Sequence, residues 1–293
     1  MIVYLNGAYV DAAEAKISVF DGGYLYGDGL FETIRLYSGK PFDLDGHLSR
    51  LKRELELLGF EWVVETEKVN DILRELASRN GLADQDSQGR LTISRGYREG
   101  DLMPLVESQA ISPTIFLAVQ SLPAEIETWQ SEGIHVQVMK SAFARGNFPQ
   151  LKTLNYLPSL MALRFAVANE CHEALLIDRQ GKVLEGAISN VFIIKNERLM
   201  TPPARLGILP GRTRSFVLDI CRSLGYACEE VAFDRRDLVT ATEVFVTSTV
   251  REVLPVTRID GSKVGDGIPG SITQAIQEKF RQAVHDTLAE YFA

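Results

Sequence analysis

The chain has few of the residues that build a metal centre or a disulfide framework. Its 293 residues include only three cysteines and four histidines. Cys171, Cys221 and Cys228 show none of the paired spacings of a zinc site. A small and odd number of thiols is typical of proteins in a reducing compartment. We therefore expect no metal site, free thiols and a cytoplasmic location.

Long apolar runs and an excess of positive charge are also lacking. No run approaches the roughly 20 residues that a membrane-spanning helix needs. The first residues lack the basic region and apolar core of a signal peptide. The chain holds 31 basic and 39 acidic residues, a net charge of −8, which disfavours nucleic acid and anionic membranes as partners. We expect a soluble protein that acts on small molecules.

The apolar pattern predicts helices and strands in both halves of the chain. Asn6-Gly7 between two short apolar runs predicts a hairpin over 2–10. Leucines recur with helical spacing from Leu44 to Leu58, which predicts an amphipathic helix that ends at Gly59. Further strands are expected at 30–37, 90–94, 114–119, 134–139, 173–177, 191–195 and 243–247, and further helices at 69–80, 157–168, 213–224 and 271–292. Because strands and helices mix without strict alternation, we predict an α+β fold with mixed sheets.

Length and composition favour two domains. The chain is 45% apolar, enough for extensive cores. Its composition shifts at 121–125, where a proline and a glutamate interrupt the apolar pattern. We predict a small N-terminal α/β domain over 1–120, a linker over 121–133 and a larger, cofactor-binding C-terminal domain over 134–293.

One lysine and one glutamate carry the functional hypothesis. Lys152 stands beside Leu151 and Leu154, and partial burial among them would lower the pKa of its amine, as a Schiff-base lysine requires. Glu185 stands among small residues that let a flat ring approach the backbone. The amine can bond the aldehyde of pyridoxal 5′-phosphate, and the carboxylate can keep its pyridine nitrogen protonated. Taken singly, Lys152 is also consistent with an ordinary surface lysine, and Glu185 with a glutamate in a turn.

Two segments and one arginine are candidates for binding the cofactor phosphate. Arg212 and Thr213 open a predicted helix whose first amides can hold an anion. Ser248 and Thr249 add hydroxyls at the end of a strand, and Arg50 is a potential bidentate donor. An ordinary helix cap, a strand edge and a solvated arginine are the plain alternatives.

Five segments in this order resemble the class IV aminotransferases, the fold-type IV pyridoxal-phosphate family. They are Tyr26–Glu32, Gln150–Tyr156, Leu184–Phe192, Gly211–Thr213 and Thr247–Thr249. The family holds branched-chain aminotransferases, D-amino-acid aminotransferases and aminodeoxychorismate lyases. The resemblance implies a two-domain subunit with the cofactor between its domains, and a homodimer whose neighbouring subunit contributes to the pocket.

The resemblance also implies a role for each matching residue. Lys152 is implied to form the Schiff base and to carry the proton between the substrate Cα and the cofactor C4′, and Glu185 to pair with the pyridine nitrogen. The remaining implied roles are Tyr156 near the ring hydroxyl, Leu209 on the ring, Arg50, Arg212, Thr213, Ser248 and Thr249 at the phosphate, and Tyr26 and Phe31 in the substrate pocket.

The three branches differ in their substrate residues. Bulky Tyr26 and Phe31 suit an apolar side chain, and Arg90 falls where the branched-chain branch carries an arginine that positions the substrate. The D-amino-acid branch uses an arginine and a histidine two residues apart, whereas the stretch Arg95–Gly100 has arginines and no histidine. The stretch Phe31–Arg35 is similar to some lyases, which eliminate pyruvate with the same lysine.

We therefore expect transamination between branched-chain L-amino acids and a 2-oxo acid such as 2-oxoglutarate. The aminodeoxychorismate lyase is the second candidate and the D-amino-acid aminotransferase the third. A catalytically silent oligomer that keeps the fold is the alternative outside the enzymes.

Overall fold

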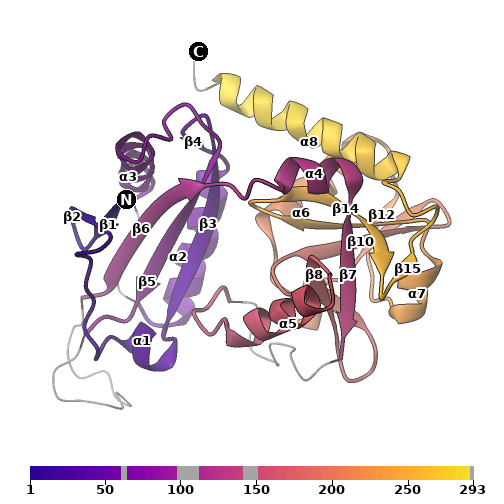
Figure 1. Ribbon diagram of the computed structural model, residues 1–293, viewed down its shortest axis with the longest axis horizontal. Coiled ribbons are helices and arrows are strands. Elements are labelled where there is room, and N and C mark those ends of the chain that lie inside the picture. The colour runs from indigo at the N-terminus through magenta and orange to yellow at the C-terminus, as the bar shows by residue number, and fades with distance from the viewer. Residues whose placement is uncertain (61–64, 98–111, 141–150, 291–293) are drawn as a thin grey trace. The chain divides into compact units, whose positions relative to one another are not determined.

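The structure, a computed structural model, describes residues 1–60, 65–97, 112–140 and 151–290. Its residues cluster into two compact units, Met1–Leu122 with Leu151–Asn155, and Pro123–Gln150 with Tyr156–Ala293. Figure 1 shows that each unit is built on a sheet of its own with helices packed against it. The two units are described separately.

The first unit contains a six-stranded antiparallel sheet in the order β2-β1-β6-β5-β3-β4. The strands are β1 (Ile2–Leu5), β2 (Ala8–Asp11), β3 (Gly29–Tyr37), β4 (Lys40–Pro41), β5 (Ser87–Ser94) and β6 (Thr114–Ser121), and the helices are α1 (Gly22–Tyr26), α2 (Leu44–Leu57) and α3 (Thr66–Arg79). The predicted hairpin joins β1 to β2, and its Asn6 and Gly7 have φ of 48° and 97°. Positive φ at both positions is what a tight hairpin turn requires.

The core of this unit lies between the sheet and the helices α2 and α3. The leucine stripe of α2 and the apolar face of α3 are buried against β3, β5 and β6, as their 3.6-residue periodicity predicts. Leu30 and Ile34 of β3 are fully buried there. This packing holds α2 beside β3, so that the two elements can share buried polar contacts.

The second unit contains a nine-stranded mixed sheet in the order β12-β11-β10-β13-β14-β7-β8-β9, with β15 paired to β14. The strands are β7 (Ile134–Met139), β8 (Glu173–Ile177), β9 (Val183–Gly186), β10 (Asn190–Lys195), β11 (Arg198–Thr201), β12 (Cys228–Glu230), β13 (Glu243–Ser248), β14 (Glu252–Ile259) and β15 (Ser262–Lys263). The helices are α4 (Ile126–Glu132), α5 (Leu157–Ala168), η2 (Ala204–Leu206), α6 (Arg212–Ser223), α7 (Arg235–Thr240) and α8 (Ser271–Glu290). Strand pairs β11·β12, β14·β7 and β7·β8 are parallel and the others antiparallel.

Long elements with a clear apolar pattern lie where the sequence predicts them, and the α+β class with mixed sheets is confirmed. The elements that the pattern misses are short, apart from β14. That strand is buried on both faces and therefore shows no alternation, and its Pro255 argues against a strand.

The predicted domain boundaries stay a prediction, because compactness alone does not show that a segment folds independently. The predicted linker 121–133 contains the last residue of β6 and the helix α4. The segment Leu151–Asn155, which the sequence-based division assigns to the C-terminal domain, clusters with the first unit.

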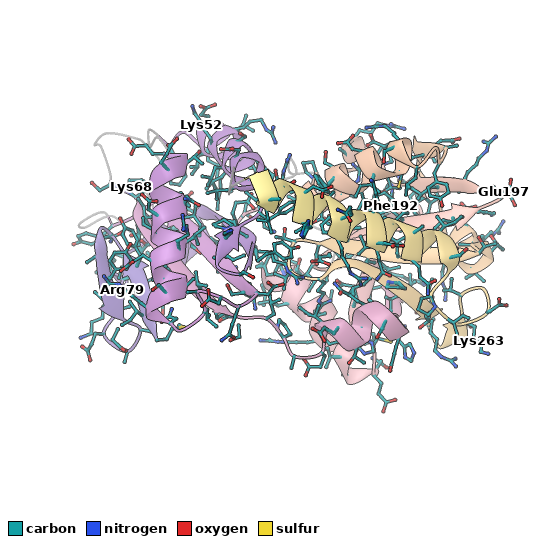
Figure 2. The ribbon with its side chains drawn as sticks, turned by 90° about the horizontal axis from the view of Figure 1, so that it is seen from above. Lys52, Lys68, Arg79, Phe192, Glu197 and Lys263 are labelled. Atoms are coloured by element: carbon teal, nitrogen blue, oxygen red, sulfur yellow. The ribbon has the colours of Figure 1, made fainter. Side chains whose placement is uncertain are left out.

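Two stacked phenylalanines lie at the centre of the second sheet. Phe192 of β10 and Phe245 of β13 are cross-strand partners, and both are fully buried. Their ring centroids are 4.8 Å apart with an interplanar angle of 7°. Figure 2 shows Phe192 in the interior of this unit, whereas Glu197 projects from the β10–β11 turn. Such a pair stabilises the fold through the burial of both rings and through the contact between them.

We expect Phe245→Ala to lower the free energy of unfolding by about 3–5 kcal/mol, because it leaves a cavity beside Phe192. Urea unfolding followed by circular dichroism measures the change. Val239→Ala on α7 is the control, since Val239 is 59% exposed and its truncation should cost less than about 0.5 kcal/mol. Equal losses in the two variants would contradict the role of the stacked pair.

Candidate active site

Lys152 lies in a short segment that pairs with the beginning of β3. The Phe31 N–H donates to the Lys152 carbonyl (2.9 Å), and the Leu154 N–H donates to the Gly29 carbonyl (3.0 Å). Leu30 and Thr153 oppose each other between these two bonds. The segment is therefore an antiparallel addition to the first sheet, and its backbone is held by β3.

The side chains of three predicted site residues meet at one aromatic ring of the first unit. The Lys152 Nζ lies 4.4 Å from the centroid of the Phe31 ring, and the Arg90 Cζ lies 3.9 Å from it. The negative face of an aromatic ring attracts cations, so the buried Phe31 gives both side chains a defined position. Arg90 also donates from Nε to the Thr92 hydroxyl (3.1 Å). Tyr26 ends α1 and is 44% exposed.

Arg50 belongs to a buried charge cluster between α2 and β3. Its Nε and Nη2 donate to the two oxygens of Glu32, both at 2.7 Å, and the His47 Nδ1 lies 2.8 Å from Glu32 Oε2. Burial raises the pKa of Glu32, but the charges and hydrogen bonds of Arg50 and His47 outweigh it and lower this pKa to about 2. The bidentate pair fixes the Arg50 guanidinium, and its contact with a phosphate stays a prediction.

Glu185 lies near the end of β9 and is held by two neighbouring segments. Its Oε2 accepts from the Leu209 N–H (2.9 Å) and from the Asn190 Nδ2 (3.4 Å). The same Asn190 Nδ2 donates to the Leu209 carbonyl (2.9 Å). Asn190 therefore connects the glutamate with the segment that the resemblance places against the cofactor ring. Only 5% of Glu185 is exposed.

A second buried glutamate shapes the turn between Glu185 and Asn190. Glu173 Oε1 accepts from the Ala187 N–H (3.1 Å), and Oε2 accepts from the Ser189 hydroxyl (2.9 Å). Burial raises the pKa of Glu173, while Arg251 and the hydrogen bonds from this turn oppose the shift. Gly186 leaves room for the same turn, since a Cβ there would lie 2.1 Å from the Ser189 Oγ and would displace this hydroxyl from Glu173.

The candidate phosphate segments of the second unit lie next to this arrangement. A Cβ on Gly211, the N-cap of α6, would lie 2.1 Å from the Asn190 Oδ1, so a larger residue there would displace the Asn190 side chain. Asn190 is also the cross-strand partner of Thr247 in β13. The chain thus brings the start of α6 and the end of β13 together around Asn190. α6 opens with Arg212 and the buried Thr213, and Ser248 and Thr249 follow Thr247.

The donor set of each unit fits pyridoxal phosphate. In the second unit, the positive end of α6 and the nearby hydroxyls suit an anion, and a buried carboxylate suits a protonated ring nitrogen. The Thr247 Oγ1 is buried and has no hydrogen-bond partner among the described residues, so its hydroxyl is available to a bound group. In the first unit, the amine of Lys152 suits the aldehyde of the cofactor.

Tyr156 and Leu209 complete the set of predicted cofactor residues. Tyr156 is the half-buried N-cap residue of α5, directly after the lysine segment. Leu209 is half-buried and contacts Glu185 and Asn190 through its backbone. Of the arginines considered for substrate choice, Arg98 lies outside the described residues.

Several polar residues of this arrangement have no role in the sequence-based hypothesis. They are Glu32, His47, Glu54, Glu173 and Asn190. Helical spacing is a signal for some of them, since His47, Arg50 and Glu54 recur beside the leucine stripe of α2. Nothing in the local sequence distinguishes Glu173 from an ordinary strand residue.

No group of three or more histidine, cysteine, aspartate or glutamate side chains in the described ranges is arranged to bind a metal ion. Within the same ranges, no helix is both long and apolar enough to cross a membrane.

The chain belongs to the class IV aminotransferases. The family model described as amino-transferase class IV matches residues 29–259, most of the chain. This family depends on pyridoxal 5′-phosphate, so the cofactor predicted from Lys152 and Glu185 is the family's cofactor. The fold and the class of enzyme agree with the prediction.

Three relatives at similar identity carry names from three different branches. A Methanocaldococcus jannaschii protein, named provisionally as a branched-chain amino acid aminotransferase, is 38% identical over 281 residues, covering 96% of each chain. The aminodeoxychorismate lyase of Bacillus subtilis is 32% identical over 99% of this chain and 97% of its own. The D-alanine aminotransferase of Bacillus licheniformis is 34% identical over 97% of each chain.

A solved structure of similar fold is the branched-chain amino acid aminotransferase of Escherichia coli. It aligns with a TM-score of 0.86 and 28% identity, covering 96% of this chain and 93% of the other. The relatives therefore establish the family and the fold, and they leave the choice of substrate to the residues of this chain.

The buried Glu32 makes stability depend on acid pH. Its pKa in the folded chain is about 2, against an ordinary value of 4.5. The cluster therefore stabilises the fold fully above pH 4.5, and this contribution is lost as the pH falls towards 2. The difference between the two pKa values corresponds to about 3 kcal/mol of folding free energy. Urea unfolding at pH 7, 4.5 and 2.5 measures this loss.

Glu32→Gln tests the assignment of this pH dependence. We expect the variant to be less stable at pH 7, because Arg50 loses its counter-charge, and to lose less stability than the wild type between pH 4.5 and 2.5. If both proteins lose equal stability over that interval, Glu32 is not the responsible group.

Proposed function

We propose that this enzyme transfers the amino group between branched-chain L-amino acids and a 2-oxo acid such as 2-oxoglutarate. The observation that carries the proposal is the cluster of Phe31, Arg90 and Lys152. A large apolar ring beside the lysine suits an aliphatic side chain. The neighbouring guanidinium suits a carboxylate. The 38% identical relative and the Escherichia coli structure support the same branch by name.

The chemistry of this proposal needs a proton carrier, a fixed carboxylate and an anion site. When bound, pyridoxal phosphate supplies an electron sink for the substrate Cα. Lys152 would hold the cofactor through its aldehyde carbon and, as a free amine, would move the proton at the substrate Cα. Glu185 maintains the proton on the ring nitrogen, and its orientation is supported by the Leu209 N–H and Asn190.

The remaining predicted residues bind and orient. We assign Arg50 and the polar groups at the start of α6 and the end of β13 to the phosphate. Tyr156 is assigned to the ring hydroxyl, Leu209 to a face of the ring and Tyr26 to the substrate pocket. These phosphate contacts would hold the cofactor independently of its bond to the lysine.

Two features argue against the D-amino-acid alternative: the stretch Arg95–Gly100 has no histidine, and Arg95 is bound within the first unit. Its guanidinium donates to the Asp28 carboxylate (Nε to Oδ2, 2.9 Å) and to the Leu58 carbonyl (2.7 Å), and it lies 3.9 Å from the centroid of the Phe60 ring. An arginine bound in this way supports the structure of the first unit instead of trapping a substrate carboxylate. The lyase remains the second candidate, supported by the Bacillus subtilis relative.

We also propose that the enzyme is a cytoplasmic homodimer. The low cysteine content supports the compartment. Apolar side chains exposed on α5, among them Leu157, Met161 and Phe165, support a surface that a second subunit covers.

The first test is spectroscopic. Protein purified with pyridoxal phosphate should absorb visible light, lose that band on borohydride treatment, and lack it in Lys152→Ala. Lys263→Ala is the control, because Lys263 is an exposed lysine on β15. L-leucine and L-valine should change the spectrum and yield their 2-oxo acids, whereas D-alanine should not.

Each failure of this test has a distinct meaning. A spectrum that stays unchanged with both L-amino acids rejects the branched-chain assignment. Pyruvate released from aminodeoxychorismate without an added amino donor supports the lyase. A colourless wild-type protein supports the silent oligomer.

Glu185→Gln tests the electron-sink role. The amide should retain the cofactor, because the phosphate and lysine contacts remain, and lower kcat about a hundredfold or more because it cannot maintain a protonated ring nitrogen. Single-turnover absorbance measures both the retention of the cofactor and the rate of turnover. The control is Glu197→Gln, at the exposed β10–β11 turn of Figure 2. Unchanged turnover in Glu185→Gln contradicts the role.

A further inference from the structure

A buried glutamate of α2 contacts the backbone of Lys152. The Lys152 N–H donates to Glu54 Oε2 at 2.8 Å, across 98 positions of the sequence. The Lys152 carbonyl accepts from the Phe31 N–H on β3. Both polar groups of this peptide unit are thus bonded, one to the sheet and one to a helix packed against it.

The position of Glu54 is one where packing alone favours an apolar residue. Glu54 is 3% exposed and directly precedes Leu55 of the buried stripe. Burial raises the pKa of its carboxyl group, and the Lys152 N–H and the Arg50 charge only partly oppose this shift. A buried carboxylate at such a site lowers the stability of the fold unless hydrogen bonds or opposite charges compensate for its removal from water.

The surroundings hold Glu54 in place. Arg50, one turn earlier on α2, is fixed by its bidentate pair with Glu32. Residues four apart on a helix share a face, so Glu54 lies beside a guanidinium that is paired with Glu32. Its other neighbour is the lysine segment, which Asn155 also ties to the Gly27 carbonyl (3.4 Å).

We propose that Glu54 is a positioning residue for Lys152: its carboxylate fixes the backbone of the lysine and thereby the place of Nζ against the Phe31 ring. This rests on the proposed role of Lys152 as the Schiff-base lysine. The lysine side chain is long and flexible, so its amine is placed accurately only if its backbone is fixed. A displacement of about 1 Å can cost about a hundredfold in rate.

Three variants distinguish the effect of the Glu54 hydrogen bond from the effect of the Glu54 charge. Glu54→Leu removes the acceptor and keeps the volume, whereas Glu54→Gln keeps an acceptor oxygen and removes the charge. Glu56→Leu is the matched control, because Glu56 lies on the exposed side of the same helix. Circular dichroism verifies that each variant is folded. If Glu54→Leu does not fold, Glu54→Ala takes its place in the comparison with Glu54→Gln.

The first measurement needs no cofactor. Amide hydrogen exchange of the apoprotein is read by mass spectrometry in the peptide that contains Leu151–Asn155. Glu54→Leu should accelerate the exchange of one amide about tenfold or more, since a bonded N–H becomes exposed to opening. Glu54→Gln and Glu56→Leu should stay within about threefold of the wild type.

The second measurement uses the enzyme loaded with pyridoxal phosphate. Glu54→Leu should lower kcat about tenfold or more and change KM less than about threefold, because the amine is misplaced while the substrate contacts persist. Glu54→Gln should restore most of kcat. A structural role without positioning would instead lower the stability of the variants and leave kcat per folded molecule unchanged.

The proposal is overturned if Glu54→Leu leaves both amide exchange and kcat at wild-type values. It is also overturned if Glu54→Gln is as impaired as Glu54→Leu, because the charge and not the acceptor would then matter. Full visible absorbance in Lys152→Ala would refute the role of the lysine instead. Amide exchange would still report whether Glu54 fixes that backbone.

Discussion

Buried carboxylates that must find hydrogen-bond donors organise both units of this enzyme. Taking such a group out of water is costly unless donors surround it. In the first unit, Glu32 is bonded by Arg50 and His47, and Glu54 by the Lys152 backbone. In the second unit, Glu173 orders the turn after β9, and Glu185 is bonded by Leu209 and Asn190. The carboxylate of Glu185 and the backbone of Lys152, the two residues on which the proposed chemistry depends, are thus oriented by the protein beforehand.

The same arrangement explains how one family supports several reactions. A lysine amine, a carboxylate for the ring nitrogen and an anion site are needed by transaminases and lyases alike. In the proposed assignment, the carboxylate is the buried Glu185 and the amine belongs to the half-buried Lys152, whose backbone is bonded on both sides. The side chains proposed to select the substrate include Arg90 and Tyr26, which are exposed on β5 and α1. Exposed positions can change without disturbing the core, so relatives of similar identity carry different names.

The predictability of each element follows the strength of its local signal. α2 and β7 lie where their patterns predict, since a buried face repeats within each of them. β9, β11 and β12 have three or four residues each, too few to establish a period. β14 is buried on both faces, and its apolar run therefore has no alternation to detect.

The candidate site also has a part that the sequence predicts and a part that it does not. The sequence by itself determined the chemical groups, because an amine at Lys152 and a carboxylate at Glu185 are properties of residue type and order. Only the tertiary structure decided what holds them. The contacts of Lys152 with Glu54, and of Leu209 with Glu185, join residues far apart in the chain. Such contacts arise when helices and strands pack. A local sequence pattern therefore does not predict which distant donor a buried carboxylate will bond.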